Sequence, residues 1–122
     1  MSIKILVVDD NPINLKLVYD LLTLESYSVI KATNAEDAIC IIDRDHLDLI
    51  LMDIELPGMD GLTLTRKLKS DSKTQKIPIV ALTAFAMKGD EEKALAAGCA
   101  AYITKPIDTR KFIQQISQLL KQ

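Results

Sequence analysis

The four residues from Leu49 to Met52 form an unbroken apolar run that ends at a single carboxylate, Asp53. A short apolar run bounded by turn residues is typical of a strand buried on both faces, although a buried helix can share the pattern. The Pro57-Gly58 pair follows closely and favours a strand that ends in a turn. Asp53 is therefore expected at the carboxyl end of a central strand, where open α/β sheets bind their ligands.

Further apolar segments of this kind alternate with stretches of helical periodicity. The other expected strands cover residues 3–8, 28–32, 77–82 and 100–103, with 28–32 at a sheet edge because it carries Ser28 and Lys31. The expected helices begin at Pro12, after Asn34, after Gly61, near Ala86 and ahead of Phe112. Five strands alternating with five helices predict an α/β fold, a doubly wound parallel sheet covered by helices on both faces.

Capping residues mark two of these helix starts. Asn11 precedes Pro12, which suits the first helical position, and Asn34 with Asp37 three residues later resembles a capping arrangement. The apolar stripe of the first helix is expected to contain Ile13, Leu17, Leu21 and Leu24, reinforced by Val18 and Leu22.

Length and composition describe one globular domain of 122 residues. Lys and Arg are scattered and the formal net charge is -2, so nucleic-acid binding has no electrostatic basis. No apolar run reaches membrane-spanning length and no signal-peptide pattern opens the chain, which predicts a cytoplasmic location without membrane insertion. Cys40 and Cys99 fit no metal spacing and are expected to be buried or half-buried, while His46 is expected at the surface.

Polar residues follow the expected strands at positions that share one edge of a parallel sheet. Asp9 and Asp10 follow the first strand, Asp53 the third, Thr83 the fourth and Lys105 the fifth. Three carboxylates in one crevice repel one another unless a cation joins them, and oxygen ligands suit Mg²⁺. A phosphoryl group on Asp53 would complete the set, because Mg²⁺, Lys105 and the Thr83 hydroxyl could each take one of its oxygens.

Each of these residues also has a purely structural interpretation when taken alone. The Asp9-Asp10-Asn11 segment could serve only to cap a helix, and Thr83 could cap the fourth helix. Lys105 could be a solvated surface residue, and Tyr102 a core aromatic. The structural interpretations do not explain why these residues share one sheet edge, and that joint placement favours a functional site.

On these residues the chain resembles the receiver domain of two-component response regulators, the CheY-like superfamily. The resemblance covers residues 1–122 as a single receiver domain without an output domain, and it implies a flavodoxin-like sheet. The strand order 2-1-3-4-5 is adopted from that known fold and not from composition. The matching motifs are Asp9-Asp10, Asp53 within Leu51-Met52-Asp53-Ile54-Glu55-Leu56-Pro57-Gly58-Met59-Asp60-Gly61, Thr83-Ala84 and Lys105-Pro106.

The resemblance implies a role for each matching residue. Asp53 would be the phosphoacceptor and would bind Mg²⁺ (or Mn²⁺) together with Asp10 and the backbone carbonyl of Glu55, while Asp9 would act through a metal-bound water. Lys105 would pair with the phosphoryl group, and its bond to Pro106 would be cis. Thr83 and Tyr102 would form the switch.

The implied function is that of a phosphorelay signalling protein rather than an enzyme, with at most Mg²⁺-dependent self-phosphorylation and self-dephosphorylation. A sensor histidine kinase or a histidine phosphotransfer protein would supply the phosphoryl group. A downstream protein would bind the face made by the fourth helix, fifth strand and fifth helix of a monomeric chain. The stretch from Leu82 to Glu92 also resembles single-domain regulators of bacterial cell-cycle and polarity control.

Two other functions use related chemistry. A phosphatase or phosphotransferase of the haloacid-dehalogenase type also has an Asp nucleophile and Mg²⁺, but usually carries a second Asp where this chain has Glu55, and it needs a cap domain. A phosphate sink that drains a kinase without an effector uses the same residues as the leading interpretation. The sequence does not distinguish a phosphate sink from a switch that acts on a downstream protein.

Overall fold

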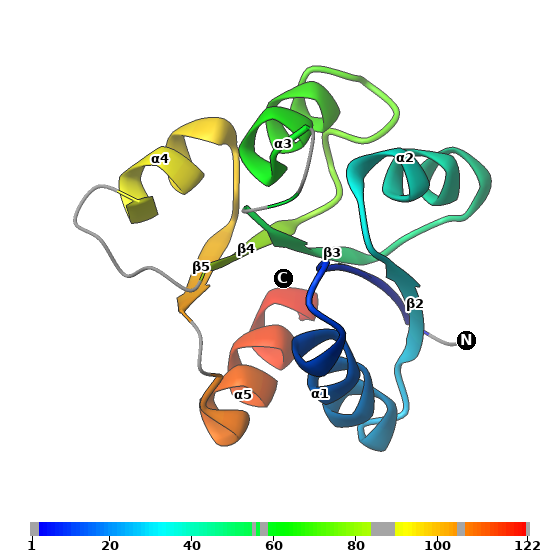
Figure 1. Cartoon of the computed structure of the whole chain (residues 1–122), viewed down its shortest axis with the longest axis vertical. Helices are drawn as coiled ribbons and strands as arrows, with labels where there is room; N and C mark the ends of the chain where they lie inside the picture. The colour runs from blue at the N-terminus through cyan, green and yellow to red at the C-terminus, as the bar shows by residue number, and fades with distance from the viewer. Residues whose placement is uncertain (1–2, 55, 57–58, 84–89, 105–106, 122) are drawn as a thin grey trace.

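A parallel five-stranded sheet in the order β2-β1-β3-β4-β5 forms the centre of the computed structural model (Figure 1). The structure describes residues 3–54, 56, 59–83, 90–104 and 107–121. The strands are β1 (Lys4–Val8), β2 (Ser28–Ala32), β3 (Leu49–Asp53), β4 (Ile79–Thr83) and β5 (Ala101–Thr104). The helices are α1 (Pro12–Leu24), α2 (Ala35–Arg44), α3 (Gly61–Lys69), α4 (Asp90–Ala97) and α5 (Thr109–Leu120). The predicted fold class, the strand order and the edge position of β2 are confirmed.

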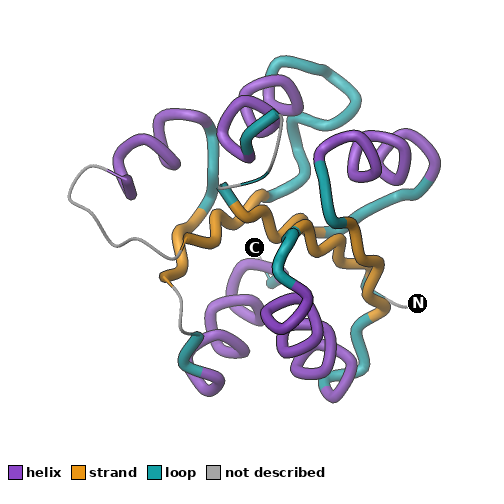
Figure 2. The backbone as a smooth tube through the Cα atoms, viewed as in Figure 1, coloured by secondary structure: helices purple, strands orange, loops and turns teal. Residues whose placement is uncertain are grey.

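Helices cover both faces of the sheet, with α1 and α5 on one side and α2, α3 and α4 on the other (Figures 1 and 2). Leu49 and Leu51 pack into the core that contains the α1 and α5 side chains, while Ile50 and Met52 pack into the opposite core. Every residue of β3 is buried. This two-sided burial is why the central strand is an unbroken apolar run instead of an alternating one.

The buried stripe of α1 contains the predicted Val18 and Leu22 but otherwise differs from the prediction. Leu15, Val18 and Leu22 face the core, whereas Ile13 and Leu24 are 78% and 79% exposed. Leu17 is also exposed, and Leu21 is only partly buried. The helix carries apolar residues around much of its circumference, so the 3.6-residue period fits more than one stripe.

Two smaller expectations are corrected or refined, and a third is not tested. Cys40 is exposed on α2, although Cys99 is buried as expected. The fourth and fifth strands are displaced toward higher residue numbers, which places Thr83 and Thr104 inside them as paired neighbours. The start predicted for the fourth helix near Ala86 lies outside the described residues.

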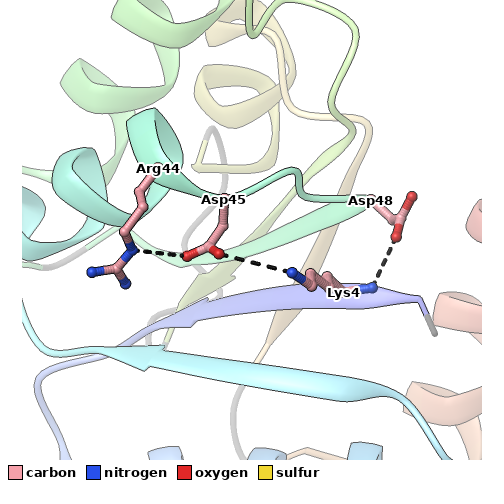
Figure 3. A network of polar contacts seen from close by, with 4 residues as sticks. All are labelled: Lys4, Arg44, Asp45 and Asp48. Atoms are coloured by element: carbon pink, nitrogen blue, oxygen red, sulfur yellow. Dashed lines mark hydrogen bonds and ion pairs between the residues drawn. The ribbon is translucent and has the colours of Figure 1, made fainter.

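A small polar network fixes the connection between α2 and β3, at the amino-terminal ends of β1 and β3 (Figure 3). The Lys4 backbone N–H donates to an Asp48 carboxylate oxygen at 2.8 Å, and the Lys4 ammonium lies 3.8 Å from Asp45. Arg44 donates to the same Asp45 carboxylate at 3.3 Å. Solvent-exposed pairs of this kind contribute about 0–1 kcal/mol each, so they fix the position of the connection more than they stabilise the fold.

The turn between α1 and β2 contains a residue in a left-handed conformation, Ser26, with φ of 67°. A residue with a side chain loses roughly 1–2 kcal/mol of folding free energy in this region of φ. Glycine avoids that loss, but its greater freedom in the unfolded chain costs roughly 0.5–1 kcal/mol on folding. Ser26→Gly is therefore expected to stabilise the protein by about 0.5–1 kcal/mol in urea denaturation. Ser28→Gly, in extended backbone two residues later, is the matched control and should destabilise it. A lower urea midpoint for Ser26→Gly would contradict this account.

Candidate phosphorylation and metal site

Three aspartates meet at the carboxyl edge of the sheet. Asp53 is the last residue of β3, and Asp9 and Asp10 follow β1, the strand that pairs with β3. One carboxylate oxygen from each lies within 4.8 Å of the others. Asp9 is 0% exposed and Asp53 is 3% exposed, whereas Asp10 faces solvent. The predicted carboxylate cluster is confirmed as a geometric arrangement.

Backbone hydrogen bonds set the position of Asp9. Its N–H donates to the carbonyl of Ala32 at 3.0 Å, which extends the β1–β2 pairing by one residue. Its carboxylate accepts the N–H of Asn11 at 2.9 Å, and the Asn11 side chain in turn accepts the N–H groups of Ile13 and Asn14. Asn11 therefore does more than the predicted helix capping, because it also joins the start of α1 to the buried carboxylate.

The start of α3 presses against the strand end that carries Asp53. The N–H of Ile54 continues the sheet by donating to Leu82 at 3.0 Å, and the Ile54 carbonyl accepts the Gly61 N–H at 3.3 Å. A Cβ atom on Gly61 would lie 2.7 Å from the Cα of Ile54 and 2.9 Å from the carbonyl carbon of Asp53. Only glycine allows this approach, a requirement that the sequence did not reveal.

Two further residues of the predicted site lie on β4 and β5. Thr83 is the last residue of β4 and is fully buried, directly beside Thr104 at the end of β5. Tyr102 is half-buried on β5 and packs against the core under α2, α3 and α4. The residues Glu55, Lys105 and Pro106 lie outside the described part of the chain, so their predicted roles stay predictions.

The donor set of this site suits a hard divalent cation. It consists of carboxylate oxygens only, with no thiolate or imidazole among the three residues. Mg²⁺ prefers such ligands and usually keeps several waters, and Asp10 supplies the solvent-facing side where waters can complete the shell. The buried Asp53 carboxylate lies next to the place where the cation would bind. The arrangement can therefore bring an oxygen nucleophile and an anionic substrate together.

The comparisons with known proteins agree with this geometry. The model of the response regulator receiver domain family matches residues 5–117. The chain belongs to this family, whose members exchange phosphoryl groups with kinases or phosphotransfer proteins in two-component signalling. Because the chain belongs to the receiver domain family, it is a signalling protein, and the haloacid-dehalogenase alternative is set aside.

Among curated proteins, the polar-differentiation response regulator DivK of Brucella ovis is 44% identical over 120 residues, which cover 98% of both chains. A putative response regulator from Chloroflexus aurantiacus superimposes with a TM-score of 0.96 at 26% identity, covering all of both chains. The receiver domain of the sensor histidine kinase PA1611 from Pseudomonas aeruginosa superimposes with a TM-score of 0.91 at 32% identity over all of both chains. It was solved with a magnesium ion coordinated in its active site cleft. None of the helices in the described ranges is long and apolar enough to cross a membrane.

Proposed function

We propose that Asp53 is the phosphoacceptor of a phosphorelay switch. The observation that carries this proposal is the burial of Asp53 at the end of β3, within 4.8 Å of two more carboxylates on the adjoining strand. An Asp53 carboxylate oxygen would attack the phosphorus of a phosphohistidine, forming an acyl phosphate while the phosphorus–nitrogen bond breaks and the histidine leaves.

The metal-binding role falls to the same carboxylates. Asp10 and Asp53 would hold Mg²⁺ (or Mn²⁺) directly, with the Glu55 carbonyl as a third ligand and Asp9 acting through water. The bound cation would offset the negative charge of the phosphoryl group and of the carboxylates around it. The magnesium ion in the related PA1611 receiver domain supports this assignment.

The switch would use the residues at the ends of β4 and β5. Thr83 is buried at the carboxyl edge. Its hydroxyl would bind one phosphoryl oxygen after a small displacement, and Lys105 would bind another. Tyr102 is half-buried, and it can turn further inward as Thr83 moves. The altered surface of α4, β5 and α5 would then bind a downstream protein.

The biological setting follows from the relatives. The chain would receive its phosphoryl group from a histidine kinase or phosphotransfer protein in the cytoplasm, as a monomer with at most slow self-phosphorylation and self-dephosphorylation. The match to DivK, which covers 98% of both chains, supports a DivK-like role for this receiver domain. The name of that relative, a polar-differentiation response regulator, supports the expected role in cell polarity.

The test is intact-protein mass spectrometry after incubation with acetyl phosphate and Mg²⁺. The wild-type chain is expected to gain one phosphoryl group, and this gain should disappear in Asp53→Ala and on chelation of Mg²⁺. Asp43→Ala is the matched control, because Asp43 is exposed on α2 and should leave the gain intact. Phosphorylation that persists in Asp53→Ala would refute the assignment of the phosphoacceptor.

A further inference from the structure

Three hydrogen bonds join the Asp9 carboxylate to the start of α1 through a single residue, Asn11. The Asn11 backbone N–H donates to Asp9 Oδ1 at 2.9 Å. The Asn11 side-chain oxygen accepts the N–H of Ile13 at 2.9 Å and the N–H of Asn14 at 3.2 Å. These side-chain bonds hold the Asn11 backbone in its extended conformation, with φ of -87° and ψ of 115°. They therefore also restrain the direction in which the Asn11 N–H points at Asp9.

The bond from Asn11 restrains the part of Asp9 that the sheet leaves free to turn. The Asp9 N–H is bound to the Ala32 carbonyl, which fixes the main chain, but the carboxylate can still rotate about its side-chain torsions. Asp9 is fully buried, so a donor that is lost there is not replaced by bulk water. Asp10 lies between Asp9 and Asn11, and its carboxylate depends on the position of the same short segment. Asn11 thus supports two of the three carboxylates of the cluster.

A second asparagine cap, at the start of α2, provides an internal comparison. The Asn34 side chain accepts the N–H of Asp37 at 2.8 Å, in the same way that Asn11 caps α1. Helix α2 follows the edge strand β2, and neither Asn34 nor Asp37 belongs to the carboxylate cluster. Loss of either cap should therefore weaken the start of a helix, whereas only loss of the Asn11 cap should disturb the cluster.

We propose that Asn11 is a positioning residue for the metal site, because its cap directs the N–H that orients the Asp9 carboxylate. The proposal rests on the proposed function, in which the carboxylate cluster binds Mg²⁺. Loss of a hydrogen-bond partner that orients the groups around a metal typically lowers metal affinity by about 10- to 100-fold. Because coupling between two binding events is reciprocal, bound Mg²⁺ should in turn hold the α1 cap more firmly.

Three substitutions of Asn11 separate the cap from the stability of the helix. Asn11→Ala removes the side-chain acceptor. Asn11→Gly also removes it, but glycine at this helix position costs little stability. Asn11→Ser keeps an acceptor that caps helices as well as asparagine does. Asn34→Ala is the matched control, because it removes the equivalent cap from α2.

The full chain of each variant is titrated with Mg²⁺ alone by isothermal calorimetry and unfolded in urea without metal. Asn11→Ala and Asn11→Gly are expected to bind Mg²⁺ about 10-fold more weakly than the wild type. Asn11→Ser and Asn34→Ala should bind it as the wild type does, although Asn34→Ala should have a lower urea midpoint. In the wild type, hydrogen exchange of the Ile13 and Asn14 amides, followed by NMR, should slow when Mg²⁺ is bound.

Wild-type Mg²⁺ affinity in Asn11→Ala and Asn11→Gly would overturn the proposal. An equal loss of affinity in Asn34→Ala would overturn it too, because general destabilisation would then be the cause. If Asn11→Ser bound Mg²⁺ as weakly as Asn11→Ala, or if Mg²⁺ left the exchange of the Ile13 and Asn14 amides unchanged, the cap would not be coupled to the site. A wild-type chain that binds no Mg²⁺ would instead refute the metal-binding role in the proposed function, and this proposal with it.

Discussion

Asp10→Asn is expected to weaken Mg²⁺ binding by at least about 10- to 100-fold, because loss of a residue that merely supports a metal ligand already costs that much. Asp10 is the solvent-facing member of the carboxylate cluster, and it is the one that can be neutralised without burying an altered group. Phosphorylation from acetyl phosphate should fall in parallel when Mg²⁺ is limiting. Isothermal titration with Mg²⁺ and the initial rate of phosphorylation are the two measurements.

Thermal unfolding gives a second readout. Asp10→Asn should be less stable than the wild type with Mg²⁺ and at least as stable without it. A cation present at 100 times its dissociation constant stabilises the folded wild-type chain by about 2.7 kcal/mol, and Asp10→Asn should lose about half of this gain or more. Without Mg²⁺ the variant should be as stable as the wild type or more so, because one of three mutually repelling charges is gone. Asp43→Asn changes an exposed aspartate outside the cluster and should behave as the wild type in both conditions. An Mg²⁺-dependent increase in stability that survives in Asp10→Asn would remove this residue from the site.

The elements that position the site could be predicted because their signals are local. A strand covered on both faces must be apolar throughout, so Leu49 to Met52 could be recognised from four consecutive residues. Parallel strands then bring the residues that follow them to one edge, which is why the grouping of Asp9, Asp10 and Asp53 followed from chain order and the adopted strand order.

The predictions that failed concern how a helix is oriented against the sheet, which the sequence pattern does not specify. In α1 the alternatives were two overlapping apolar stripes, and the one containing Leu15 is buried while Ile13 faces solvent. The choice depends on the angle at which the helix leaves β1, a tertiary property. The contact of Gly61 with the Asp53 peptide was missed for the same reason, since a glycine after Asp60 reads equally well as an ordinary turn residue.

Gly61→Ala is expected to destabilise the fold by about 1–3 kcal/mol, as additions to a well-packed interior do. The sign is the opposite of the usual effect, since alanine is favoured over glycine in a helix by about 1 kcal/mol. The added methyl group would meet backbone atoms of Asp53 and Ile54, which have no rotamer by which to move away. Relief requires either the first turn of α3 or the end of β3 to shift.

A shift at the end of β3 would move the Asp53 carboxylate away from Asp9 and Asp10, so Gly61→Ala should also weaken Mg²⁺ binding. Productive geometry at a site tolerates displacements of only about 0.5 Å, and phosphorylation should slow as well. Thr63→Ala is the control on the same helix turn, because Thr63 is exposed. It should leave Mg²⁺ affinity unchanged and keep the helix stable. Urea denaturation and Mg²⁺ titration of the two variants together separate a general weakening of α3 from displacement of the site. A Gly61→Ala protein that unfolds earlier yet binds Mg²⁺ as tightly as the wild type would show that α3 yields and β3 does not.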